Sequence, residues 1–184
     1  MQRRSFLRSA VSAFPIALTQ PFALATESSD SNAKEVHVVS SGQDRFGEAH
    51  SRGYSHILFK NSTKETSGNL FLIEHNNLVT GGPPLHLHLE QEEWFYVMEG
   101  EVLFRIGERH LQLKPGDSVL APRKVPHAFT AAGPIPGKML IAFSPAGKME
   151  QFFRDTAIPN PPLQDAAFFR KYDMELIGPP LKTT

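Results

Sequence analysis

The chain has 184 residues, and its 19 Lys and Arg balance 19 Asp and Glu, so its formal charge is zero with neutral histidine. This balance excludes the basic surface typical of nucleic-acid-binding proteins, and we expect no nucleic-acid partner. The absence of cysteine excludes disulfides, thiolate metal sites and cysteine nucleophiles, so any metal must be bound by His, Asp or Glu. With 14 Phe, 15 Pro and 13 Gly, the composition indicates a phenylalanine-rich core in a chain with many turns.

The first 25 residues have the features of an export leader. Residues 2–8, Gln-Arg-Arg-Ser-Phe-Leu-Arg, resemble the twin-arginine export motif, and residues 23–25 have the Ala-x-Ala form that signal peptidases accept. The apolar run between them is interrupted by two prolines and is too short to span a bilayer. We predict a twin-arginine signal peptide over residues 1–25, no stable membrane insertion after its cleavage, and a periplasmic or secreted protein. An N-terminal amphipathic helix is the alternative.

Residues 26–55 are predicted to form an N-terminal extension, with a first short strand at Val36–Val39 and a loop at Gln43–Gly53. From residue 56 onward, short apolar runs alternate with turn residues. Glu99-Gly100 and Gly107-Glu108 indicate two-residue hairpins. Pro115-Gly116 is typical of the centre of a type II turn.

The region 56–145 is predicted to be one all-β barrel. Strands broken at intervals of about 8–12 residues favour a barrel or sandwich over alternating βαβ units. The candidate strands are His56–Lys60, Leu70–His75, Leu85–His88, Glu93–Met98, Glu101–Ile106, Arg109–Leu113, Ser118–Ala121, His127–Thr130 and Lys138–Phe143.

Residues 146–184 are predicted to form a short helical tail. Lys148–Thr156 carries apolar residues at helical spacing, Leu163–Leu176 is a weaker helix candidate, and three prolines separate the two. These helices would cover the barrel or a partner subunit. Because a single barrel exposes sheet edges and this tail is rich in aromatic residues, we expect a homodimer. The aromatic residues concerned are Phe152, Phe153, Phe168 and Phe169.

Histidines supply the most informative pattern. His86 and His88 are two residues apart, so on a strand both imidazoles point to the same face. Glu93 opens the next predicted strand, and His127 begins a later one. Two histidines from one strand, an acid from its neighbour and a distant histidine can converge on one metal ion.

These residues lie in two segments that resemble the conserved motifs of cupins. Residues 82–100 resemble the first motif, in which a Gly precedes His-x-His, a Glu and a second Gly; residues 116–131 resemble the second motif. The first Gly is displaced by one position, Lys124 stands where the second motif has Gly, and Ala131 stands where it has Asn. None of these departures falls on a position that binds metal in the family.

The resemblance implies a small single-domain cupin, similar to the quercetin-dioxygenase-like proteins, with an all-β double-stranded β-helix of the jelly-roll kind. It implies the metal ligands His86, His88, Glu93 and His127. Glu93 is preferred over Glu92 because it lies seven positions before Gly100, as the motif requires, and shares a strand face with Phe95 and Val97.

Three imidazoles and one carboxylate suit Fe(II), Mn(II), Ni(II), Zn(II) or Cu(II). We prefer Fe(II) or Mn(II), because export of a folded protein would let the cell load the metal before other metals compete for the site. A barrel lined by phenylalanine would admit a small organic molecule. The candidate lining residues are Phe71, Phe95, Phe104, Phe129 and Phe143.

Three functions compete at this stage. The resemblance implies a metal-dependent oxygenase that acts on a small organic substrate. The alternatives are another metal-dependent cupin enzyme, such as a decarboxylase, isomerase or lyase, and a binding cupin without catalysis. The non-redox enzyme would need a protein acid or base. The weak candidates for that role are Glu74 and Tyr96, and a salt-bridged or exposed Glu74 is the simpler interpretation.

Overall fold

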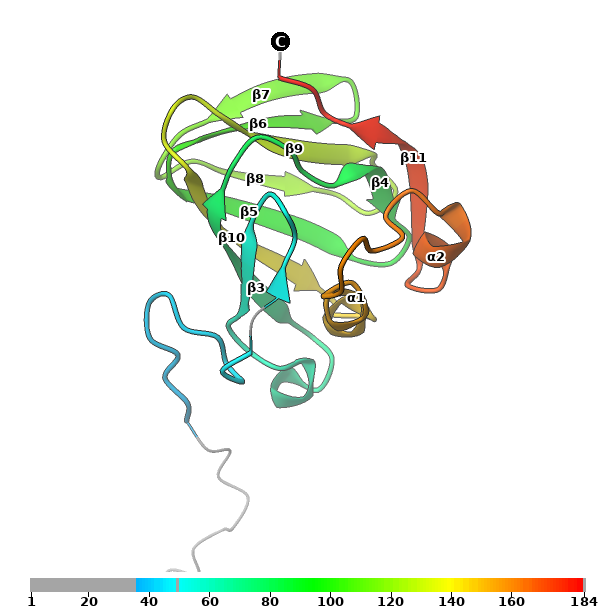
Figure 1. Ribbon diagram of the computed structural model, residues 1–184. Helices are drawn as coiled ribbons and strands as arrows, with labels where there is room; N and C mark the ends of the chain where they lie inside the picture. Colours follow the sequence, from blue (N-terminus) through cyan, green and yellow to red (C-terminus); the bar gives the residue numbers. More distant parts are fainter. Residues whose placement is uncertain (1–35, 49, 184) are drawn as a thin grey trace, which may run out of the picture. The chain divides into compact units, whose positions relative to one another are not determined.

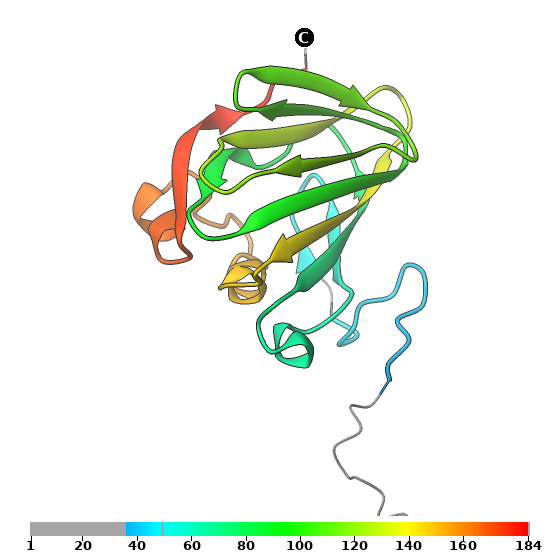
Figure 2. The same cartoon turned by 180° about the vertical axis from the view of Figure 1, so that it is seen from behind.

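A computed structural model describes residues 36–48 and 50–183, and it contains two antiparallel sheets in two layers (Figure 1). Six strands form one sheet in the order β1-β2-β3-β10-β5-β8, and five form the other in the order β11-β4-β9-β6-β7. Figure 2 shows the two layers from behind. The all-β jelly-roll architecture is therefore confirmed, whereas the predicted signal peptide lies outside the described residues.

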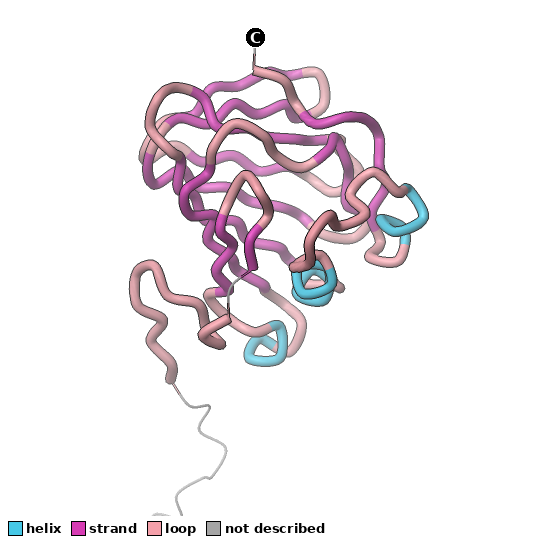
Figure 3. The backbone as a smooth tube through the Cα atoms, viewed as in Figure 1, coloured by secondary structure: helices cyan, strands magenta, loops and turns pink. Residues whose placement is uncertain are grey.

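In residues 36–48 and 50–183 the strands carry almost all of the regular structure, and helices are confined to three short segments (Figure 3). Among the described residues, no helix is long and apolar enough to cross a membrane. The elements in chain order are β1 (His50–Ser51), β2 (His56–Phe59), the 3₁₀ helix η1 (Thr63–Thr66), β3 (Phe71–Leu78), β4 (Pro84–His88), β5 (Glu92–Glu99), β6 (Glu101–Ile106), β7 (Arg109–Leu113), β8 (Ser118–Ala121), β9 (His127–Ala132), β10 (Gly137–Ser144), α1 (Met149–Asp155), α2 (Ala166–Arg170) and β11 (Met174–Pro180).

The predicted strands from residue 56 to 143 all form, and β6, β7 and β8 match their predicted bounds. The two hairpins also form at the expected places. Gly100 has φ 68° between β5 and β6, and Gly107 has φ 57° between β6 and β7. These left-handed conformations are readily adopted by glycine, which explains why the turn residues located the strand ends so well.

The N-terminal predictions were wrong in two places. Val36–Val39 forms no strand, and Val36 and Val38 are exposed. No neighbouring strand pairs with this segment in the described part of the chain, so its alternating valines bury nothing. Conversely, the predicted loop at Gln43–Gly53 contains β1, whose two residues pair with the start of β2.

The C-terminal prediction was wrong beyond residue 170. Helix α2 begins after Asp165, whose carboxylate accepts a hydrogen bond from the Ala167 N–H at 2.8 Å, and it ends at Arg170. The next strand, β11, pairs antiparallel with β4, with Met174 opposite His88. This segment forms a strand and not a helix because the strand covers an edge of the sheet, whereas the helical pattern of the segment is weak.

Phenylalanine side chains fill the space between the sheets, as the composition predicted. Phe59, Phe71, Phe95, Phe104 and Phe143 are fully buried, and each contributes roughly 1.5–3 kcal/mol of burial free energy. The tail joins this core, because its side chains at positions 152, 153 and 169 are buried within the same chain. Phe168 is half-buried, so the tail leaves little exposed aromatic surface to support a dimer, and the homodimer stays a prediction.

Gly82 lies two residues before the start of the histidine-bearing strand β4 and against the backbone of β9. A Cβ at this position would overlap the carbonyl oxygen of Phe129, whereas a Cβ at Gly178 would meet only Leu85 atoms, at an ordinary distance of 3.7 Å. Backbone atoms of a paired strand cannot move aside without shifting the strand.

We expect Gly82→Ala to lower the free energy of unfolding by about 2–4 kcal/mol, because β4 and β9 must separate to admit the methyl group. Gly178→Ala is the control, with an expected change below about 1 kcal/mol. Urea unfolding of both variants measures the difference. Equal losses in the two variants would contradict the close approach at Gly82.

Candidate metal centre

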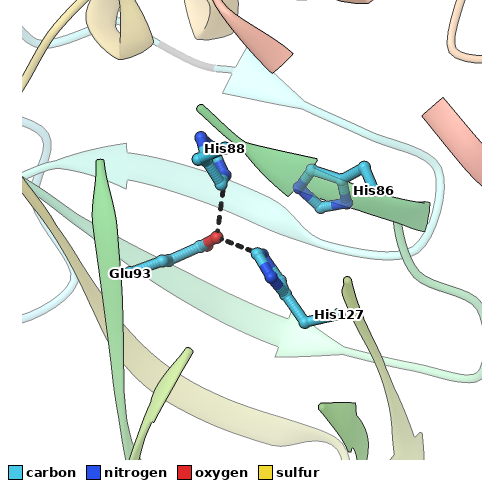
Figure 4. Close-up of side chains that lie close together, drawn as sticks. All are labelled: His86, His88, Glu93 and His127. Atoms are coloured by element: carbon cyan, nitrogen blue, oxygen red, sulfur yellow. Dashed lines mark hydrogen bonds and ion pairs between the residues drawn. The ribbon is translucent and has the colours of Figure 1, made fainter. Parts of the chain in front are cut away.

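The strand register places the three histidines together. His86 and His88 lie on one face of β4, and His86 is the residue directly opposite His127 on β9. Glu93 comes from β5 in the other sheet and points toward them across the interior (Figure 4). The cluster is thus assembled between the two layers, and all four residues are buried.

The four side chains bring their ligand atoms within 4.8 Å of one another. The Oε2 atom of Glu93 lies 3.0 Å from Nε2 of His88 and 2.7 Å from Nε2 of His127. The ring of His86 completes the group, with its centroid 4.6 Å from that of His127 (Figure 4). The structure therefore brings together the ligand set that the resemblance implied.

Backbone carbonyls orient two of the imidazole rings. Nδ1 of His86 lies 2.8 Å from the carbonyl oxygen of Pro84, and Nδ1 of His127 lies 3.0 Å from that of Val125. A carbonyl can only accept, so each Nδ1 carries a proton and donates it. This fixes the tautomer of His86 with a free Nε2 lone pair and turns Nε2 of both rings toward the cluster, as metal-binding histidines require.

Burial and neighbouring charge shape the protonation states. Burial is the main cause that lowers the pKa of His86 to about 3, and the positive charges of His127 and His88 lower it further. For Glu93, burial acts to raise the pKa, but His127 and His88 outweigh it through charge and hydrogen bonds and hold the pKa well below its usual range. The cluster thus favours an ionised carboxylate and a neutral His86, the forms that bind metal.

The donor set and its spacing fit a divalent metal ion. Ligands at about 2.1 Å from an octahedral ion lie roughly 3–4 Å apart, close to the spacing of this cluster. Glu93 is 4% exposed, and its carboxylate forms ion pairs with His88 and His127, but with no Lys or Arg among the described residues. A buried carboxylate needs a cation, and one divalent ion can satisfy all four side chains.

The neighbouring acidic residues lie outside the cluster, as expected. Glu92 points away from Glu93 and accepts from Arg123, with 2.7 Å between Nε and the carboxylate oxygen. Glu90 is exposed. The alternation along β5 thus places one acid of the pair inside the barrel and the other at its surface.

Glu74 and Tyr96, the two weak candidates for an acid or base, lie on the outer face of their sheet. The Glu74 carboxylate is 3.1 Å from Nζ of Lys60 and 3.7 Å from Nζ of Lys138. Tyr96 stacks on Trp94 with ring centroids 5.9 Å apart. On each strand these residues alternate with the residues whose side chains point inward, so neither side chain reaches the cluster.

A narrow apolar chamber adjoins the four side chains. The volume of this cavity is about 30 Å³, enough for roughly two waters. Of the predicted lining residues, Phe129 and Phe143 reach it, whereas Phe71, Phe95 and Phe104 belong to the surrounding core. The tail helices supply the remaining aromatic wall, namely Phe152, Phe153 and Phe169.

Three polar residues of the chamber wall were missed by the sequence analysis: Arg52, Tyr54 and His75. Burial first, and the charge of Arg52 second, lower the pKa of His75 to about 3, so this imidazole is neutral, and its Nδ1 has no hydrogen-bond partner. Burial raises the pKa of Tyr54, and the Glu93 carboxylate raises it further. His75 shares its strand face with Phe71 and Ile73, a signal that could have placed it inside; the loop residues Arg52 and Tyr54 carry no such periodicity.

Comparison with known proteins agrees with this arrangement. Residues 78–143, which include all four cluster residues, match a family model described as the cupin domain. An RmlC-like cupin from Shewanella frigidimarina superposes with a TM-score of 0.52 at 22% identity, covering 64% of this chain and 98% of that chain. The fold is that of a cupin. Its second motif keeps a left-handed turn, because Lys124 adopts φ 65° at the position where the motif has Gly.

Two further proteins are similar to this chain. A variant of Streptomyces PAC13 with uridine superposes on 80% of this chain and 94% of its own, with a TM-score of 0.54 and 10% identity. A segment of 61 residues is 34% identical to an uncharacterized protein of Methanocaldococcus jannaschii. That segment covers 33% of this chain and 49% of the relative, so the match spans about half the length of the curated relative.

We expect Glu93→Gln to weaken metal binding by more than about 100-fold, since losing even a hydrogen-bond partner of a ligand typically reduces affinity 10–100-fold. Glu92→Gln is the matched control and should retain the metal, because its carboxylate pairs with Arg123 at the surface. Metal content after dialysis against a chelator measures both. The opposite ranking of the two variants would show that the wrong carboxylate has been assigned.

Proposed function

We propose that this cupin is a metal-dependent enzyme that acts on a small organic molecule at the His86, His88, Glu93 and His127 centre, most simply as an oxygenase. The observation that carries the proposal is the Glu93 carboxylate, buried between two imidazole Nε2 atoms with no Lys or Arg partner among the described residues. An ion-binding cluster that only stabilised the fold would not need an adjoining chamber with unpaired polar groups in its wall.

The expected cofactor is one divalent ion, with Fe(II) or Mn(II) preferred and Ni, Zn or Cu as alternatives. The bound ion would supply Lewis acidity and, in the case of iron or manganese, redox chemistry with dioxygen. The chain supplies the environment for that chemistry. Its aromatic wall excludes bulk water and strengthens electrostatic interactions inside the chamber.

A second enzymatic function is favoured by one specific observation. His75 lines the chamber as a neutral imidazole with an unpartnered Nδ1, and the phenol of Tyr54 lies in the same wall. These are groups that could transfer a proton in a decarboxylase, isomerase or lyase. Pac13, whose structure is similar, is described as a nucleoside dehydratase, and a shared fold leaves the reaction open. A binding cupin without catalysis is the third candidate.

Turnover by reconstituted protein separates these candidates. We expect oxygen uptake with flavonol or diketone substrates by the Fe(II)- or Mn(II)-loaded protein, and loss of at least about 100-fold in rate for His88→Ala, since that variant lacks one ligand of the metal. Glu92→Gln is the control with full activity. The readouts are an oxygen electrode and product analysis.

His75→Gln then distinguishes the two enzyme classes. Retained metal with oxygen uptake near the wild-type rate supports the oxygenase. Retained metal with loss of an oxygen-independent reaction supports the acid–base alternative. Metal-loaded protein that converts no substrate in a broad screen would contradict both and favour the binding cupin.

Export and self-association remain proposals alongside the site. The resemblance of residues 2–8 to the twin-arginine motif supports a periplasmic or secreted location. A homodimer is now supported by the outer face of the larger sheet, where Trp94 and Leu120 pair across β5 and β8 and both are partly exposed.

We also expect the leader to determine which metal the exported protein carries. If residues 1–25 direct export of the folded protein, the exported protein should carry Fe(II) or Mn(II). Exchanging these residues for a leader of the unfolded-chain route should yield Zn(II) or Cu(II), which bind more tightly to nitrogen and oxygen ligands. Metal analysis of the two exported proteins tests this expectation. The same metal in the same amount by both routes would contradict the link.

A further inference from the structure

Arg52 is a buried cation in the wall of the metal chamber. It follows β1, its side chain is 7% exposed, and it lines the chamber together with His86, His88 and Glu93. It also lines a second, outer cavity of about 620 Å³. Tyr54 and Leu163 are the other residues common to both cavities. Arg52 therefore lies where the inner chamber meets the larger outer space.

The guanidinium of Arg52 has no acidic partner among the described residues. Its Nη2 donates a hydrogen bond to the hydroxyl of Thr156, and its Nε has no hydrogen-bond partner. Its Cζ lies 5.1 Å from the ring centroid of Phe152 and 4.8 Å from that of Phe153. Burial lowers the pKa of Arg52 to about 10, which still leaves the group charged at neutral pH.

These contacts do not compensate the charge. Stacking on aromatic rings and one charge-assisted hydrogen bond to a hydroxyl stabilise a guanidinium, but neither supplies an opposite charge. A buried ion without an opposite charge nearby keeps much of its desolvation penalty. Arg154 shows the usual solution in the same molecule. Its guanidinium also lies over phenylalanine rings, but it pairs with Glu150 at 2.9 Å and with Glu48 at 2.6 Å.

We propose that Arg52 binds the carboxylate of the substrate, so that the enzyme prefers small organic acids to their neutral counterparts. The proposal rests on the proposed function of the metal centre and specifies its substrate class. The guanidinium fork matches a carboxylate in geometry, and a divalent ion with one Glu ligand adds further positive charge to the chamber.

The two cavities would hold different parts of the ligand. The inner chamber has space for about two waters, which suits a carboxylate head but not an aromatic body. The outer cavity is large enough for that body, and Ile158, Pro159 and Leu163 give it apolar walls. The neutral imidazole of His75 has a free Nδ1 in the chamber wall and offers the carboxylate a second hydrogen-bond partner.

Ligand affinity measured by calorimetry on the metal-loaded protein tests the proposal. The ligands are acetate, phenylacetate, benzoate and 2-naphthoate, each compared with its neutral amide. In the wild type, the best carboxylate should bind about 10- to 100-fold more tightly than its amide, as expected for a charge-assisted pair. In Arg52→Met this preference should disappear, while the metal content and the affinity for the amide stay within about threefold.

Arg154→Met is the matched control, because it removes another guanidinium stacked on phenylalanine but one that is already paired and lies outside the chamber. It should keep the carboxylate preference. Arg52→Lys keeps the charge without the fork, and it should retain a reduced preference even if the methionine variant fails to fold. The proposal is overturned if no carboxylate is preferred by the wild type, if the preference survives in Arg52→Met, or if Arg52→Lys keeps the full preference of the wild type.

The result also separates this proposal from the one on which it rests. Metal binding with turnover of neutral substrates, and no carboxylate preference, would remove the role of Arg52 alone. Arg52-dependent carboxylate binding by a protein that binds no metal would remove the proposed enzyme and leave an anion-binding cupin.

Discussion

The candidate metal centre depends on one interaction, the contact of the Glu93 carboxylate with the Nε2 atoms of His88 and His127. The acid comes from one sheet and the imidazoles from the other, so the contact also joins the two layers of the barrel. Inside an apolar core this arrangement holds only if a proton or a metal ion compensates the charge. The requirement for a cation is therefore a property of the folded interior as much as of the residues themselves.

The buried phenylalanines explain the protonation states and charges of the polar groups near the centre. The same dry surroundings that keep His75 neutral also make the unpaired charge of Arg52 costly. An electrostatic interaction formed here is stronger than one at the surface, where Glu92 meets Arg123 in contact with water. The aromatic core thus determines both which groups are charged and how strongly those charges interact.

Much of the barrel could be predicted because its turns and alternation are local signals. The choice of Glu93 over Glu92 followed from strand alternation and the motif spacing, and the structure places the two residues on opposite faces. The fold of residues 174–180 could not be predicted in this way, because β11 forms by pairing with an edge of β4 that is distant in sequence. Arg52 was missed for a related reason, since a loop residue has no periodicity to indicate which side of the chain is buried.

The pairing of β11 with β4 has a consequence for how the protein is made. Synthesis runs from the N-terminus, so all four cluster residues leave the ribosome before the strand that pairs beside His86 and His88. Until residues 174–180 arrive, β4 has an open edge with unpaired backbone groups, which invites pairing with another chain. The histidine strand is thus protected only late in translation, and a nascent chain that stalls before β11 would leave His86 and His88 beside an unpaired strand edge.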